Sequence, residues 1–210
     1  MQNRPFDPAR IGRALDEAGQ GFGPDERAKL AEYLNLLVKW NAAYNLTGIR
    51  DPDALVERHL VESLELAPLL RGTRIADVGT GAGLPGIPLA IVAPDRHFVL
   101  IESRAKRVRF LRHVVATLGL GNAEVAHCRV EDLRCEHAFD TVLARAVAPP
   151  AELAGMTRHL TAPGTVLLLL TAARLGEEWR AKAAELGLRA VRIDAPARPG
   201  RSSIVMLERI

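Results

Sequence analysis

A glycine-rich stretch contains the residues whose types and spacing point most directly to chemistry. Residues 77–86 read Asp-Val-Gly-Thr-Gly-Ala-Gly-Leu-Pro-Gly and lie between a short apolar run and a longer apolar segment. This order predicts a strand, a tight turn and a helix, and glycines at the turn allow a ligand to approach the backbone. The first turn of the helix offers unpaired amide donors. We therefore expect a cofactor site at this turn.

Two classes of cofactor fit this turn. Residues 81–86 match the dinucleotide fingerprint, and Glu102 lies 19 residues beyond Gly83, so an NAD-dependent oxidoreductase is one hypothesis. S-adenosyl-L-methionine is favoured by Asp77, because an acid in the mouth of the site suits an ammonium and a sulfonium but not a pyrophosphate. Glu131 also favours it, since an adenine amino group needs an acceptor after the third predicted strand. A glycine turn without any ligand is the third possibility.

Glu102 has two possible roles at the end of the second predicted strand. A carboxylate there can accept hydrogen bonds from both ribose hydroxyls of a nucleotide. It can also cap the helix that begins near Arg104. Both roles are compatible only if the two carboxylate oxygens divide them.

Alternating strands and helices are predicted from residue 73 onward. The predicted strands are Arg74–Val78, His97–Ile101, Ala123–His127, Thr141–Ala144, Thr165–Leu170, Leu188–Ile193 and Ser203–Leu207. The predicted helices between them include Leu84–Val92, Ala105–Leu118, Pro150–Leu160 and Leu175–Leu186. Short apolar strands separated by helices indicate a parallel sheet covered on both faces. The last connection is too short for a crossover helix, so the final strand should be antiparallel.

This pattern predicts an α/β fold, a Rossmann-like S-adenosylmethionine-dependent methyltransferase with a mostly parallel seven-stranded sheet and a final antiparallel strand. The residues before it predict helices. Pro24 begins one helix, with acids in its first turn, and Asp51 is a plausible N-cap of the next. We expect a helical N-terminal cap over residues 1–72 and a methyltransferase domain over residues 73–210.

Composition narrows the class of protein. The 210 residues carry a net charge of +3, and 48% of them are hydrophobic, which excludes a disordered chain. The longest apolar run, residues 166–170, is too short to span a bilayer, and the first residues lack the apolar core of a signal peptide. Cys128 and Cys135 are too few for a disulfide framework or a four-cysteine zinc site. We expect a cytoplasmic protein, a monomer with no membrane partner and no metal.

Several stretches together resemble one family. They are residues 40–47, Arg58-His59, residues 77–89 and 106–111, with Arg129-Val130-Glu131 and Ala144-Arg145-Ala146. The chain resembles the bacterial small-subunit ribosomal RNA guanine-N7 methyltransferases, also called the glucose-inhibited division protein B family. The resemblance covers roughly residues 30–170. The Gly-Leu-Pro-Gly-Ile-Pro extension of the glycine-rich stretch is a much more specific motif than a dinucleotide fingerprint alone.

The resemblance implies transfer of a methyl group from S-adenosyl-L-methionine to N7 of one guanine in 16S rRNA, by resemblance guanine 527. The partner would be 16S rRNA, the 30S ribosomal subunit or its precursor. Arg145 would be a cofactor-side or substrate-side arginine, and Asn45 and His59 would lie near the mouth of the site. The expected catalytic residues are Arg145, Asn45 and His59. The expected cofactor-binding residues are Asp77, Gly79, Gly81, Gly83, Leu84, Glu102, Val130, Glu131 and Arg145.

Two features of the chain bear on this function. The family often has a Lys-Gly pair where this chain has Thr171-Ala172. Either another residue takes over the role of that lysine toward RNA, or that role is dispensable in this chain. Lys106, Arg109 and His113 form one side of a predicted helix and would suit phosphates, although a solvated face is the alternative. A ribosome-assembly factor that kept the fold without turnover is a further alternative.

Overall fold

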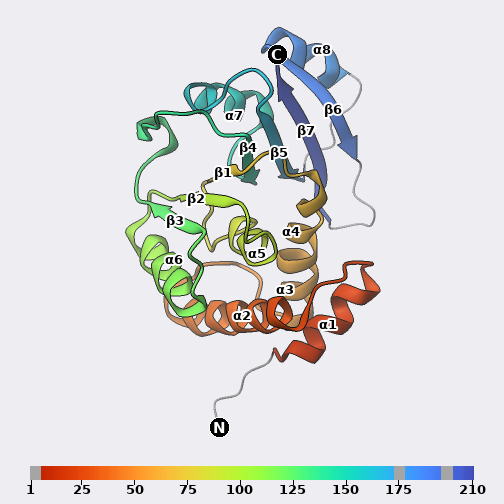
Figure 1. The fold of residues 1–210 in the computed structure, drawn as a ribbon, viewed down its shortest axis with the longest axis vertical. Helices are drawn as coiled ribbons and strands as arrows, with labels where there is room; N and C mark the ends of the chain where they lie inside the picture. The colour runs from red at the N-terminus through yellow and green to blue at the C-terminus, as the bar shows by residue number, and fades with distance from the viewer. Residues whose placement is uncertain (1–5, 173–177, 195–200) are drawn as a thin grey trace.

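One sheet of seven strands organises the chain, in the order β3-β2-β1-β4-β5-β7-β6 (Figure 1). The computed structural model describes residues 6–172, 178–194 and 201–210. The strands are β1 (Arg74–Val78), β2 (His97–Ile101), β3 (Ala123–Ala126), β4 (Thr141–Arg145), β5 (Val166–Thr171), β6 (Leu188–Asp194) and β7 (Ser203–Arg209). β1 to β5 pair in parallel, whereas β7 pairs antiparallel to both β5 and β6. The predicted sheet is confirmed.

The helices also follow the predicted pattern, with differences at their ends. They are α1 (Pro8–Glu17), α2 (Pro24–Tyr44), α3 (Pro52–Leu55), a π-helix (Val56–Val61), α4 (Glu62–Leu64), α5 (Gly86–Val92), α6 (Ala105–Leu118), α7 (Pro150–Met156) and α8 (Glu178–Glu185). Single 3₁₀ turns occupy Ala67–Leu69, Val130–Asp132 and Arg158–Leu160. α5 begins two residues later than predicted because residues 79–85 form the loop. Residues 175–177 of the last predicted helix lie outside the described residues.

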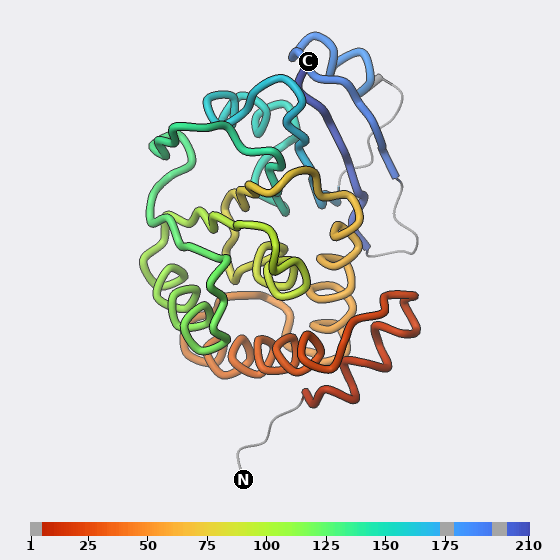
Figure 2. Tube along the Cα trace, viewed as in Figure 1, coloured from red at the N-terminus to blue at the C-terminus, as the bar shows by residue number. Residues whose placement is uncertain are grey.

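Two apolar layers cover the two faces of the sheet. One contains α7, α8 and residues such as Ala76 and Val142. The other contains α5, α6 and the N-terminal helices, with Ile75 and Leu143 from the sheet. α2 contacts both α5 and α6, and Figure 2 shows the red and orange N-terminal chain lying along these helices. Residues on both sides of the predicted boundary therefore share one core, and the division into residues 1–72 and 73–210 stays a prediction.

The N-terminal helices form where the sequence predicts them. Pro24 occupies the first turn of α2, and Asp51 caps α3 by accepting a hydrogen bond from Ala54 N at 2.7 Å. α2 ends at Asn45, which adopts a left-handed φ of 50°. Among the described residues, no helix is long and apolar enough to cross a membrane.

We predict that Leu34→Ala lowers the free energy of unfolding by about 2–5 kcal/mol, because removing the fully buried side chain would leave a cavity in the apolar layer that α2 shares with α5 and α6. Urea denaturation measures this change. The matched control is Lys39→Ala, an exposed position on the same helix, which should change stability by less than about 0.5 kcal/mol. Equal losses in both variants would contradict the burial argument.

Candidate functional site

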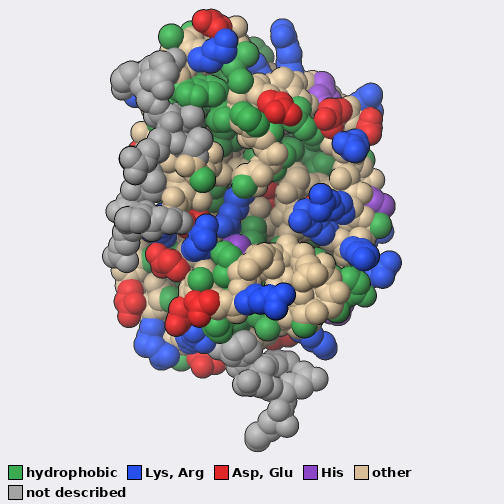
Figure 3. All heavy atoms as spheres, turned by 180° about the vertical axis from the view of Figure 1, so that it is seen from behind, with side chains coloured by type: hydrophobic (Ala, Val, Ile, Leu, Met, Phe, Trp, Pro, Cys, Tyr) green, Lys and Arg blue, Asp and Glu red, His purple; other side chains and the backbone are tan. Residues whose placement is uncertain are grey.

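A cavity of about 520 Å³ lies at the carboxyl ends of β1, β2 and β4. The chain leaves β1 toward β2 and β3, whereas β4 lies on the other side of β1, so the crevice forms where the strand order reverses. In the space-filling view from behind, Lys and Arg side chains and a histidine border the hollowed middle of the molecule (Figure 3). The lining residues are Leu46, Thr47, His59, Gly79, Thr80, Gly81, Ala82, Leu84, Glu102, Ser103, Arg104, Arg107, Arg145, Ala146 and Val147.

The glycine loop forms one wall of this cavity. Gly79 has a φ of 60°, and a Cβ there would lie 2.9 Å from Val147 Cγ2, so only glycine fits without a shift. Gly83 has a φ of 92°, and a Cβ there would lie 2.5 Å from Ile87 Cγ1. Gly83 therefore allows the loop to pack closely on α5. Contrary to expectation, it is not among the residues that line the cavity.

Asp77 lies behind the loop, so its expected place in the mouth of the site is wrong. Its side chain is fully buried because alternate residues of β1 face the layer of N-terminal helices. Asp77 Oδ2 accepts hydrogen bonds from Thr80 Oγ1 and, at 2.8 Å, from Gly86 N, which joins the two ends of the loop. Burial raises the pKa of this carboxyl to about 7, although the two hydrogen bonds oppose the shift.

Glu102 is not the N-cap of α6, because Arg104 occupies that position without a side-chain cap hydrogen bond, but its two oxygens bind two different segments. Oε1 accepts a hydrogen bond from Arg104 N at 2.8 Å, at the start of α6, and Oε2 accepts one from Gly81 N at 3.1 Å. Arg107 Nη1 lies 3.4 Å from Oε2. The carboxylate is 4% exposed and lines the cavity. Glu102 thus connects the loop to α6 and leaves remaining acceptor positions for a ligand.

Arg145 ends β4 and lines the cavity with a side chain that is 14% exposed. Its Nη2 lies 3.6 Å from Glu62 Oε2, and its buried Nη1 has no hydrogen-bond partner among the described residues. Burial lowers the pKa of Arg145, and the charge of Glu62 opposes that shift. Sequence reasoning missed Glu62, since an acid within an apolar helical pattern carries no signal of its partner.

His59 lies in the π-helix with 6% of its surface exposed, and it lines the cavity. Its Nε2 forms a hydrogen bond of 2.7 Å with Thr47 Oγ1, and its Nδ1 has no partner in the described part of the chain. Burial lowers the pKa of His59 to about 4, and the nearby charge of Arg145 acts in the same direction. The imidazole is therefore neutral at neutral pH.

The structure brings together only part of the expected set. Gly79, Gly81, Leu84, Glu102, Arg145 and His59 line the cavity. Outside its lining lie exposed Asn45, which ends α2, and Val130 and Glu131 in a 3₁₀ turn. Neither Thr171 nor Ala172 lines it.

Two neighbouring features of the lining were not predicted. Thr47 holds His59 through its hydroxyl group. Ala146 follows β4 with a φ of 51°, a conformation that costs energy for a residue with a Cβ and that is often found at functional sites. The described residues contain no cluster of three or more His, Cys, Asp or Glu that could hold a metal ion.

Comparisons with known proteins agree with this architecture. A family model described as GidB, rRNA small subunit methyltransferase G, matches residues 26–195. The protein named ribosomal RNA small subunit methyltransferase G from Cronobacter sakazakii is 42% identical over 197 residues, which cover 93% of this chain and 95% of that one. The protein of the same name from Yersinia pseudotuberculosis is 41% identical over 201 residues, covering 95% and 98%.

A solved structure supports the fold independently. A SAM-dependent methyltransferase from Aquifex aeolicus superposes with a TM-score of 0.60 at 18% identity, covering 79% of this chain and 97% of that one. At this level of identity the likeness concerns the fold. It confirms the predicted Rossmann-like architecture.

We predict that His59 makes the protein less stable in acid. The unfolded chain binds this proton near pH 6.5 and the folded chain only near pH 4, so stability should fall by up to about 3 kcal/mol as pH decreases between these values. His59→Gln should remove this part of the pH dependence, as measured by urea denaturation from pH 7 to pH 4. The control is His137→Gln, at an exposed position. The same pH dependence in both variants would refute the assignment.

Proposed function

The chain belongs to the rRNA small subunit methyltransferase G family, and on that premise we propose that it transfers a methyl group from S-adenosyl-L-methionine to N7 of a guanine in 16S rRNA, by resemblance guanine 527. The main observation behind the proposal is that Gly79, Glu102 and Arg145 line one cavity, which lies where the strand order of the sheet reverses. Family membership speaks against the oxidoreductase hypothesis for the same loop.

The residues of the cavity fit this cofactor. A volume of about 520 Å³ lies within the range of small-molecule sites. The buried carboxylate of Glu102 is placed to accept a ribose hydroxyl through Oε1, which has a further lone pair beyond its bond from Arg104 N, whereas Oε2 already accepts from Gly81 N and Arg107 Nη1. Arg145 lines the cavity, where its guanidinium can donate to a carboxylate of the cofactor or to the RNA. Gly79 and Gly81 let the ligand approach the backbone.

When bound, S-adenosyl-L-methionine supplies an electrophilic methyl group on a sulfonium. Guanine N7 has an in-plane lone pair and no proton, so the protein needs no general base. Its task is to align the nucleophile with the methyl group and to tolerate positive charge on the guanine ring. His59 is suited to this task, because it lines the cavity and its neutral imidazole adds no positive charge there. Arg145 must leave N7 free and therefore contacts phosphate, O6 or the cofactor.

The RNA partner is supported by basic side chains next to the cavity. Arg104 and Arg107 line it, and Lys106 and Arg109 are exposed on α6. N7 lies in the deep major groove of an RNA helix, so the target guanine must be in a loop or extruded. The proposed substrate is 16S rRNA, either free or within the 30S subunit or its precursor. We also propose that the protein acts in the cytoplasm, since its relatives are named for methyl transfer to ribosomal RNA, and that it does so as a monomer.

We predict that the purified protein transfers labelled methyl from S-adenosyl-L-methionine to 16S rRNA that lacks the modification. The assay compares free rRNA with 30S subunits and maps the labelled base. Label at N7 of one guanine is expected because the site needs only to align a lone pair. Cofactor binding with no label on free rRNA or 30S subunits would point to an assembly precursor as the substrate, and no label on that precursor either would contradict the proposal and favour a ribosome-assembly factor.

We predict that Glu102→Gln weakens the binding of S-adenosylhomocysteine by about tenfold to a hundredfold, because a charged acceptor for the ribose is lost. Isothermal titration calorimetry measures this affinity. The control is Glu124→Gln, which removes an exposed carboxylate on β3 and should leave affinity unchanged. Unchanged affinity in Glu102→Gln would mean that this carboxylate only organises the loop.

A further inference from the structure

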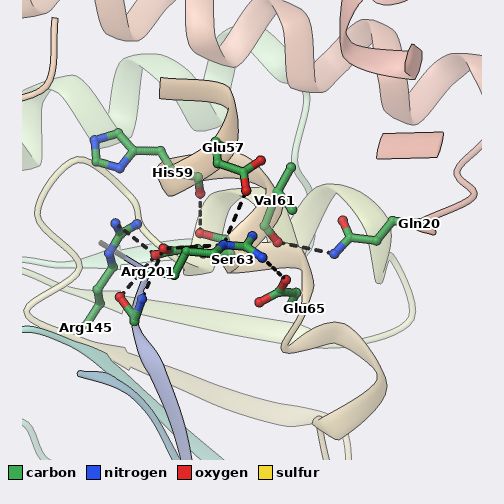
Figure 4. A network of polar contacts seen from close by, with 10 residues as sticks. Gln20, Glu57, His59, Val61, Ser63, Glu65, Arg145 and Arg201 are labelled. Carbon is green, nitrogen blue, oxygen red and sulfur yellow. Dashed lines mark hydrogen bonds and ion pairs between the residues drawn. The ribbon is translucent and has the colours of Figure 1, made fainter. Parts of the chain in front are cut away.

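A buried carboxylate joins the site arginine to the C-terminal strand. Glu62 is 1% exposed and lies in α4. Its Oε2 lies 3.6 Å from Arg145 Nη2 and accepts a hydrogen bond from Ser202 Oγ at 3.1 Å, while Oε1 accepts one from Ser202 N at 3.2 Å. Figure 4 shows Arg145 and Arg201, the residue before Ser202, in this network of polar contacts. Three segments far apart in the sequence thus meet at one side chain.

Arg201 completes the cluster beside Ser202. Its Nη1 lies 3.0 Å from Glu65 Oε1, and its Nε lies 3.3 Å from Glu57 Oε1 and 4.0 Å from Glu62 Oε1. Its side chain is 14% exposed. The guanidinium of Arg201 therefore holds the segment just before β7 against the helical segment that carries these acids (Figure 4).

The two buried charges of Glu62 and Arg145 depend on each other. A buried charge is costly unless a partner and hydrogen bonds compensate it. In the described chain, Glu62 is the carboxylate within ion-pair distance of Arg145. Ser202 donates to both oxygens of that carboxylate and so fixes its orientation. If Glu62 were neutral, the guanidinium would be drawn toward water in the cavity and away from its place on the wall.

We propose that Glu62 is a positioning residue for methyl transfer, which holds the Arg145 guanidinium at the cavity wall while Arg201 and Ser202 hold Glu62. The inference rests on the proposed function. Glu62 does not line the cavity, so it acts through Arg145 and not on the substrate. The alternative is that Glu62 only ties the C-terminal strand to the helices.

A double-mutant cycle on methyl transfer distinguishes these roles. Glu62→Gln should lower kcat/KM for the RNA by about tenfold to a hundredfold, as expected when a reacting group is misplaced. Arg145→Met should lower it at least as much. The double variant should be no worse than Arg145→Met alone, and Glu62→Asp, which keeps the charge, should recover part of the activity. Multiplying losses in the double variant would overturn the proposal.

The matched control is Glu65→Gln, which removes a carboxylate that contacts Arg201 and not Arg145. It should keep kcat/KM within about twofold of the unmodified protein, because Arg201 retains Glu57. A loss as large as that of Glu62→Gln would favour the purely structural role. Thermal unfolding of each variant shows that the comparison is made on folded protein.

Two further measurements keep the test decisive. If Glu62→Gln does not fold, Ser202→Ala replaces it, since this change keeps both charges and removes one hydrogen bond. Its smaller loss of activity should vanish in the Arg145→Met background. If the unmodified protein transfers no methyl group, the proposed function fails separately. The cycle is then measured on 16S rRNA affinity, where multiplying losses would overturn the positioning role.

Discussion

The parallel pairing of β1 with β2 on one side and β4 on the other sets the geometry of the site. Val78, the last residue of β1, lies opposite Ile101 of β2 and Ala144 of β4. The next residues along each strand are therefore neighbours at one edge of the sheet, and they are Gly79, Glu102 and Arg145. A shift of one residue in either pairing would turn these side chains to the opposite faces. The backbone hydrogen bonds of three strands thus place the residues that line the cavity.

Charge balance is the second constraint on the site. Asp77 and Glu62 are buried on the side of the N-terminal helices. Burial lowers the pKa of His59 and raises that of Asp77, and the charge of Arg145 adds to the first shift and opposes the second. Burial also raises the pKa of Tyr33, whose hydroxyl donates to Ala82 O at 2.8 Å behind the loop. Two ion pairs, Glu102 with Arg107 and Glu62 with Arg145, therefore balance charge at the wall of the cavity, which Arg104 also lines.

The N-terminal helices contribute more to the site than a cover over it. The π-helix supplies His59, α4 supplies Glu62, and the chain after α2 supplies Thr47. His59 and Thr47 reach the cavity, and Glu62 reaches Arg145 behind it, because α2 and α4 pack on α5, which follows the glycine loop. The site is consequently shared between the two parts of the sequence that pattern alone distinguishes.

Local sequence determined the elements of this protein and the residues at their ends. Apolar runs define β1 and β2 to the residue, Asp51 marks a helix start, and the glycine loop with Glu102 indicates a nucleotide-like cofactor, because these features depend on neighbours in the chain. Tertiary structure alone decided the rest. Which face of β1 carries Asp77, and which acid pairs with Arg145, depend on contacts between segments up to 140 residues apart. No local periodicity reports such contacts, since burial and charge pairing arise only when the layers pack.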